Sequence, residues 1–268
     1  MKTRTIFMSL FLTTFCILNL KAQDVKNELS DDQLIKLFAG LRVADVCDGM
    51  DMAGLMNVGL VDQSIAPLWK DSENFSHQFV GIALTVKYIP SQRMQVPDEP
   101  GLDSYKNWRD KWYTHISGEP FIEEIKPGHV IVIDNKGDGD TDCGTIGSNN
   151  SMLWTTQGAV GIVTAGGMRD IDEVIKQKIP VYTDYDNRGR GIRPGRNELE
   201  SYNQPITIGN TLINPGDVII ADSDGVIVVP REMAMKVADG AREELNLDKA
   251  ARRKLYDELG IPLDFTVE

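Results

Sequence analysis

An Arg-Asp pair is the most specific chemical signal in this 268-residue sequence. Arg169 and Asp170 follow an apolar run and a glycine turn at residues 161–168, where a helix is expected to begin. The planar guanidinium of Arg169 suits a carboxylate or an enolate, and Asp170 supplies a hard oxygen ligand for a divalent cation. A structural alternative is that Asp170 and Glu173 cap the helix and Arg169 pairs with a surface acid.

A glycine-containing loop precedes this pair and leads into another expected helix. The loop, residues 143–150, ends with Gly147, Ser148, Asn149 and Asn150. We predict that Ser148 caps the helix. Free backbone N–H groups at helix starts bind anions, so the amides of Asn149 and Asn150 could hold a carboxylate. Arg169 would then close the other side of the site.

The elements that must position these residues alternate between strands and helices. Runs rich in β-branched residues predict strands at residues 80–86, 130–134, 160–164, 207–212, 218–221 and 226–229. A capping box at residues 30–33 starts an amphipathic helix, residues 175–178 fit a short helix before an extended segment at 180–183, and a long amphipathic helix follows Pro230. This alternation favours an α/β fold.

Two stretches interrupt the pattern. Residues 89–124 contain four prolines and a group of aromatic residues, and residues 184–204 are rich in Arg, Gly and Asn. Long loops with aromatic residues often line a site, so the first insert could shape the pocket. The alternative, which we favour, is an excursion with its own small satellite core.

The first residues predict export. Residues 1–22 combine Lys2 and Arg4 with an apolar stretch and end at Ala22, which is typical of a cleaved secretory signal. A membrane anchor is the alternative, but the apolar stretch is shorter than the roughly 20 residues that a spanning helix needs. We therefore expect one secreted or periplasmic domain at residues 23–268, with no membrane contact after cleavage.

The composition excludes some partners. The formal net charge is −12, and removal of the signal takes away three basic residues and no acidic one, which gives −15. Nucleic acid and anionic membranes are therefore not expected as partners. Only Cys47 and Cys143 remain in the mature chain, which does not favour a disulfide framework.

Three weaker signals have structural explanations. The acidic residues at 138–142 resemble the start of a calcium loop but lack its later ligands, so we expect a solvated loop. Residues 222–225 predict a hairpin turn in which Gly225 adopts a positive φ. Asp45 and Asp48 are expected at a solvated helix edge.

Taken together, the motifs resemble the regulator of ribonuclease activity A family, which includes 4-hydroxy-4-methyl-2-oxoglutarate aldolases and oxaloacetate decarboxylases. The resemblance spans residues 34–245 and is carried by residues 143–150, 158–163, 166–170, 214–222 and 224–230. It implies a single-domain layered αββα sandwich, similar to swivelling domains, with mixed sheets and a C-terminal helix. It also implies a trimer or hexamer with the site at a subunit interface.

The resemblance assigns roles to the candidate residues. Arg169 would contact the keto oxygen and the developing enolate, and Asp170 would be the direct protein ligand of Mg²⁺ or Mn²⁺. The segment from Gly147 to Asn150 would bind the substrate, with the amides of Asn149 and Asn150 on its carboxylate. No cofactor other than the metal is implied.

The sequence departs from the family at one position. Lyases of the family carry Asp twenty-one positions before the Arg, and this sequence has Ser148 there. Serine cannot carry a charge or act as an equivalent base. The family also brings a carboxylate from a neighbouring C-terminal helix, for which Glu243 and Glu244 are the candidates.

Two functions follow from these observations. The first is an exported divalent-metal-dependent carbon-carbon lyase that forms pyruvate from a small 2-oxo or 4-hydroxy-2-oxo acid, by aldol cleavage or decarboxylation. The second is a non-enzymatic oligomeric binding or regulatory protein that kept the scaffold and lost catalysis at Ser148. Because the Arg-Asp pair and the amide loop both remain, we favour the lyase.

Overall fold

The computed structural model describes residues 29–93, 96–135, 143–187 and 189–268. The chain divides into a unit that ends at Ser30 and a unit from Asp31 to Glu268, and the following description concerns the second unit. The expected signal peptide at 1–22 and the acidic loop at 138–142 lie outside the described residues, so both stay predictions. Among the described residues, no helix has the length and apolar content required to cross a bilayer.

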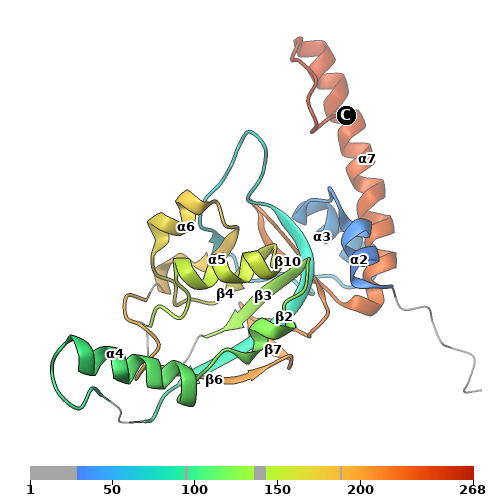
Figure 1. The fold of residues 1–268 in the computed structure, drawn as a ribbon. Coiled ribbons are helices and arrows are strands. Elements are labelled where there is room, and N and C mark those ends of the chain that lie inside the picture. The colour runs from blue at the N-terminus through green and yellow to red at the C-terminus, as the bar shows by residue number, and fades with distance from the viewer. Residues whose placement is uncertain (1–28, 94–95, 136–142, 188) are drawn as a thin grey trace, which may run out of the picture. The chain divides into compact units, whose positions relative to one another are not determined.

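A mixed sheet of eight strands forms the centre of the domain (Figure 1). Its path runs β1 (Ile65–Pro67), β5 (Val181–Asp184), β4 (Gly161–Thr164), β3 (His129–Asp134), β2 (Phe79–Pro90), β9 (Val218–Asp222) and β10 (Gly225–Val229), and β6 (Asn197–Tyr202) also pairs with β2. The four strands β2 to β5 are parallel, and the other pairs are antiparallel. Strands β1 and β10 at the two ends contact each other, so the sheet is nearly closed.

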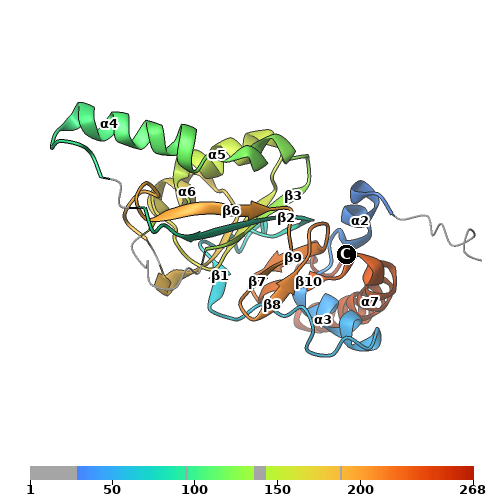
Figure 2. The ribbon, with the colours of Figure 1, turned by 90° about the horizontal axis from the view of Figure 1, so that it is seen from below.

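The described residues form six α-helices and four short helical turns, and the helices other than Leu102–Lys111 pack around this sheet. They are α2 (Asp31–Phe38), α3 (Val43–Met52), α4 (Leu102–Lys111), α5 (Ser148–Gln157), α6 (Ile171–Gln177) and α7 (Ala234–Leu259), with short helical turns η1 (Trp112–Ile116), η2 (Pro120–Glu124), η3 (Tyr185–Asn187) and η4 (Arg231–Met233). Helices α5 and α6 form the crossovers between the parallel strands β3, β4 and β5. Figure 2 shows them on one side of the sheet, with α3 and α7 on the other side.

Two buried apolar clusters hold these layers together. One cluster is enclosed by the curved sheet and includes Val132, Val163 and Ile219. The other lies between the sheet and α5, and includes Ile131 and Trp154. Neighbours along β3 therefore point to opposite clusters, which explains why this strand is apolar without alternation.

The predicted α/β fold with mixed strands and a C-terminal helix is confirmed. The prediction of one strand at residues 207–212 is wrong, because the segment is a hairpin of β7 (Ile206–Ile208) and β8 (Thr211–Ile213). Gly209 and Asn210 have φ values of 50° and 63° and form its turn. Strand β6, in the second insert, was not predicted, because its polar sequence lacks an apolar run.

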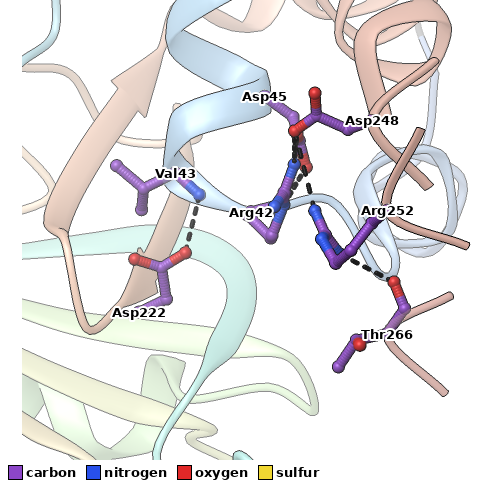
Figure 3. Close-up of polar contacts among 7 residues, drawn as sticks. All are labelled: Arg42, Val43, Asp45, Asp222, Asp248, Arg252 and Thr266. Carbon is purple, nitrogen blue, oxygen red and sulfur yellow. Dashed lines mark hydrogen bonds and ion pairs between the residues drawn. The ribbon is translucent and has the colours of Figure 1, made fainter. Parts of the chain in front are cut away.

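The expectation of a solvated edge at Asp45 is also wrong. The Asp45 side chain is 2% exposed, accepts the Arg42 N–H at 2.9 Å and caps α3. Arg42 also donates to Asp248 of α7 at 2.8 Å, and Arg252 donates to the Thr266 carbonyl (Figure 3). This network joins the start of α3 to the exposed half of α7 and to the C-terminal residues.

The first insert shares the main core. Phe121 is fully buried and its ring packs edge-on against Trp154 of α5, with 5.6 Å between centroids. The preference for a separate satellite core is therefore wrong for this part of the insert. Helix α4 has no buried residue and projects from the domain in Figure 2. The insert is thus anchored at its C-terminal end, next to α5.

Replacing Phe121 tests this anchor. Phe121→Ala should lower the free energy of unfolding by about 3–5 kcal/mol, since it removes a large buried side chain and leaves a cavity beside Trp154. Leu102→Ala on α4 is the control, because Leu102 is 66% exposed and its loss should change stability by about 0.5 kcal/mol or less. Urea denaturation measures both. Equal losses would contradict the shared core.

Candidate active site at the start of helix α5

Three loop segments meet beside the N-terminus of α5. The Gly144 N–H donates to the Gly191 carbonyl at 2.7 Å, and the Ile146 N–H donates to the Gly167 carbonyl at 3.1 Å. The Arg169 N–H in turn donates to the Ile146 carbonyl at 2.9 Å. The loop at residues 143–147 therefore runs between the Arg169 loop and the second insert like a short extra strand.

Two glycines allow the Arg169-Asp170 pair to lie against this loop. A Cβ atom at Gly144 would stand 2.6 Å from Arg169 Cδ, and one at Gly147 would stand 2.7 Å from Asp170 Oδ2. Either contact is shorter than carbon and oxygen atoms tolerate, so a side chain would displace the pair. The glycine spacing in the sequence thus has a steric reason at this site.

The two side chains of the pair converge, as the sequence analysis requires. Arg169 Nε donates to Asp170 Oδ1 at 3.1 Å. The backbone N–H and the hydroxyl of Ser148 donate to Asp170 Oδ2 at 3.2 and 3.4 Å. The side chains of Arg169 and Asp170 remain 33% and 31% exposed, so both can still reach a ligand.

The structure contradicts both capping interpretations. Asp170 stands at the N-cap position of α6, but its side chain makes no capping bond there. Its φ of 56° turns the carboxylate toward α5 instead, a conformation that Asp tolerates better than most residues. The N-cap of α5 is Gly147 rather than Ser148, whose hydroxyl faces Asp170. Both side chains are therefore committed to the site.

The backbone N–H groups of Asn149 and Asn150 lie in the first turn of α5. Neither has an acceptor among the described residues. Asn149 is exposed and Asn150 is partly exposed. Unpaired N–H groups at the positive end of a ten-residue helix bind a carboxylate well. The predicted anion cradle therefore has the required donors next to Asp170.

The structure adds two charged residues that the sequence did not reveal. Glu119 of the first insert accepts hydrogen bonds from the Asn150 side chain, and Arg193 of the second insert donates to Glu119 at 2.8 Å. Burial raises the pKa of the Tyr88 hydroxyl, which donates to Glu119 at 3.0 Å. Burial acts to lower the pKa of Arg193, but the neighbouring Tyr88 and Glu119 raise it on balance. No local motif marks these residues, because each lies far from its partner in the sequence.

The other predicted residues lie elsewhere. Glu243 and Glu244 are on α7, which packs on α3 and α2, and α7 is apart from α5 and α6 in both views of the fold (Figures 1 and 2). A role for either at this site requires a second subunit. Within the described residues, no group of three or more His, Cys, Asp or Glu side chains could hold a metal. Among the described residues, Asp170 is the acid that lies beside Arg169 and Ser148.

Comparison with known proteins identifies the family. Residues 43–228 match the sequence model of the RraA-like family, described as Aldolase/RraA. This match covers more than half of the chain. The chain therefore belongs to the RraA-like family.

Individual relatives agree with this assignment. The chain is 26% identical over 208 residues to "Protein DlpA" of Legionella pneumophila, a match that covers 77% of this chain and 29% of that protein. It is 34% identical over 137 residues to the "Putative 4-hydroxy-4-methyl-2-oxoglutarate aldolase" of Halalkalibacterium halodurans, which covers 50% and 61%. The chain thus spans less than two thirds of either relative. Relatives with such names support a lyase family.

A solved structure supports the fold. The structure of RraAS2 from Streptomyces coelicolor, titled an unusual member of the RNase ES inhibitor RraA protein family, has a TM-score of 0.63 at 22% identity. The match covers 84% of this chain and 98% of that one. This likeness concerns the fold alone.

A stability measurement separates a functional carboxylate from a structural one. Asp170→Asn should change the free energy of unfolding by less than about 1 kcal/mol, since Asn tolerates the same backbone and no capping bond is lost. Asp217→Asn is the control, because the buried Asp217 accepts the Asn214 N–H at 2.8 Å and its loss should cost about 1–3 kcal/mol. Equal costs in urea denaturation would make Asp170 a structural residue.

Proposed function

We propose that this chain is an exported divalent-metal-dependent carbon-carbon lyase that forms pyruvate from a small 2-oxo acid. The observation that carries the proposal is the convergence of Arg169, Asp170 and the free N–H groups of α5 on one partly exposed site. Family membership and the aldolase names of relatives support a lyase. Export is inferred from residues 1–22 alone.

The donor set at Asp170 fits a hard divalent cation. The carboxylate is partly exposed and its oxygens are hard ligands, and Mg²⁺ commonly keeps several waters beside one or two protein carboxylates. Asp170 would hold the ion, and water would complete its ligands. Mg²⁺ or Mn²⁺ bound there would supply Lewis-acid stabilisation of the negative charge that develops on the substrate.

The residues of this chain then perform three tasks. The N–H groups of Asn149 and Asn150 bind the substrate carboxylate and fix its orientation. Arg169 donates to the keto oxygen, where negative charge develops. Breakage of the C3–C4 bond leaves its electron pair on C3, which is delocalised onto that oxygen as an enolate, and protonation at C3 gives pyruvate. The C4 fragment leaves as carbon dioxide, or as a carbonyl compound after its hydroxyl loses a proton.

The second candidate function is a non-enzymatic oligomeric binding protein. Ser148 favours it, because the hydroxyl donates to Asp170 and provides no base where the family lyases have an acid. In the lyase, the carboxylate of Glu243 or Glu244 from a neighbouring subunit would take that role. Substrate turnover distinguishes the two candidates.

The activity assay follows from these roles. The mature protein should release pyruvate from oxaloacetate or from 4-hydroxy-2-oxo acids with Mg²⁺ or Mn²⁺, and EDTA should stop it. Arg169→Ala and Asp170→Asn should each lower kcat by about 10²–10³-fold, since each removes a group that stabilises the developing charge. Asp172→Asn, two residues away and exposed, is the control. A rate of pyruvate release that is unaffected by EDTA and by these substitutions would exclude the proposed lyase.

We also propose that the protein is a homo-oligomer, a trimer or a hexamer. The buried residues of α7 lie in its first half, whereas Leu247, Leu255 and Leu259 are 59%, 54% and 72% exposed. Such an apolar surface favours contact with a second copy.

Disruption of this surface tests the assembly. Leu255→Asp should reduce the mass measured by light scattering and lower any activity that needs a neighbouring acid. The neighbouring exposed Lys254→Asp is the control and should leave the mass unchanged. A monomeric wild-type protein with full activity would contradict an interface site.

A further inference from the structure

Both inserts supply charged residues at the start of α5. Glu119 stands between η1 and η2 in the first insert, and Arg193 precedes β6 in the second. The Asn150 side chain donates to Glu119 Oε2 at 3.1 Å, so Glu119 lies one side chain away from the N–H groups of α5. The inserts therefore form a wall of the same site that holds Arg169 and Asp170.

The guanidinium of Arg193 is buried in this wall. Its side chain is 3% exposed, and its Cζ lies 4.8 Å from the ring centre of Tyr88 and 5.0 Å from that of Tyr113. Nη2 pairs with Glu119 Oε1 at 2.8 Å, whereas Nη1 has no partner among the described residues. A buried N–H without an acceptor is unfavourable, so Nη1 is a donor in need of an acceptor.

The carboxylate of Glu119 can accept a further hydrogen bond. Oε1 accepts from Tyr88, Arg193 and, more weakly, Asn150, whereas Oε2 accepts from Asn150 alone among the described residues. A carboxylate oxygen can accept two hydrogen bonds, so Oε2 can take one further donor. The pair thus combines a spare donor and a spare acceptor, and its two charges cancel.

A spare donor on Arg193 beside a spare acceptor on Glu119 suits a hydroxyl group of a ligand better than a second carboxylate of that ligand. A hydroxyl group can donate to Glu119 Oε2 and also accept a hydrogen bond. A carboxylate cannot donate, would face the negative Glu119, and would gain little from Arg193, whose charge Glu119 already neutralises. Tyr113 adds a partly exposed phenol beside the same guanidinium.

We propose that Glu119, Arg193 and Tyr113 recognise hydroxyl groups on the distal part of the substrate, so that the preferred substrate is a 2-oxo acid with a neutral, hydroxylated chain, such as a 3-deoxy-2-oxo sugar acid, rather than a dicarboxylate. This inference rests on the proposed function, because it assumes that the substrate carboxylate binds the N–H groups of Asn149 and Asn150. Glu119 is then the residue that determines specificity.

The test compares two substrates on the mature protein. Pyruvate release is measured with a six-carbon 3-deoxy-2-oxo aldonic acid and with oxaloacetate, in the presence of Mg²⁺. The wild type should have the higher kcat/KM with the hydroxylated acid. Glu119→Gln should lower that kcat/KM by about 10- to 100-fold, the range expected for a lost hydrogen bond to a charged group, and should change the value for oxaloacetate by less than about threefold.

Two further variants make the result specific. Glu123→Gln is the matched control, because Glu123 lies on η2, directly after Glu119, and is exposed, and it should leave both values unchanged. Tyr113→Phe removes only a phenol hydroxyl and should shift the ratio of the two kcat/KM values in the same direction as Glu119→Gln, by a smaller factor. It keeps the test decisive if Glu119→Gln does not fold.

The outcomes separate this inference from the proposed function. A wild type that prefers oxaloacetate, or variants that lower both kcat/KM values equally, would overturn the inference and leave the lyase intact. A protein that releases pyruvate from neither acid refutes the lyase. In that case calorimetric binding of gluconate and of succinate decides the inference, which requires that gluconate bind more tightly and that Glu119→Gln remove this preference.

Discussion

The contact between the Asp170 carboxylate and the first residue of α5 determines the geometry of the whole site. Asp170 adopts a left-handed backbone conformation, so its side chain points across to Ser148 rather than into its own helix. Gly147 provides the space for this contact, and Gly144 does so for Arg169. The start of α5 thereby gathers an acid, a guanidinium and free N–H groups.

The two inserts contribute the charged residues Glu119 and Arg193 beside the start of α5. Buried charges are tolerated when they are paired and hydrogen-bonded, and Glu119 and Arg193 satisfy each other while Asn150 and Tyr88 donate to Glu119. Phe121, two residues after Glu119, anchors this arrangement in the core. The inserts therefore contribute a buried, paired charge cluster beside the start of α5.

Strands and loops that depend on neighbouring residues were predicted from the sequence. Contacts between residues that lie far apart in the sequence were missed. Apolar runs predicted most of the sheet, and the glycine loops indicated Arg169, Asp170 and the start of α5, which the structure brings together, because these signals lie within a few residues of each other. Glu119 lies 31 positions before Asn150, and β6 is held by pairing with β2 rather than by its own composition. The capping role expected of Ser148 failed for a related reason, since propensity identifies a helix start but does not reveal a partner such as Asp170.

The presence of serine at position 148 has a consequence for how the site could work. A carboxylate there would place a second negative charge close to Asp170 at the start of α5. The Ser148 hydroxyl instead donates to Asp170 and carries no charge, so position 148 supplies no carboxylate base. A lyase built this way would take its proton acceptor from another position, for which we propose Glu243 or Glu244 of a neighbouring subunit. In that proposal α7 would serve catalysis through Glu243 or Glu244 in its first half and assembly through the exposed leucines of its second half.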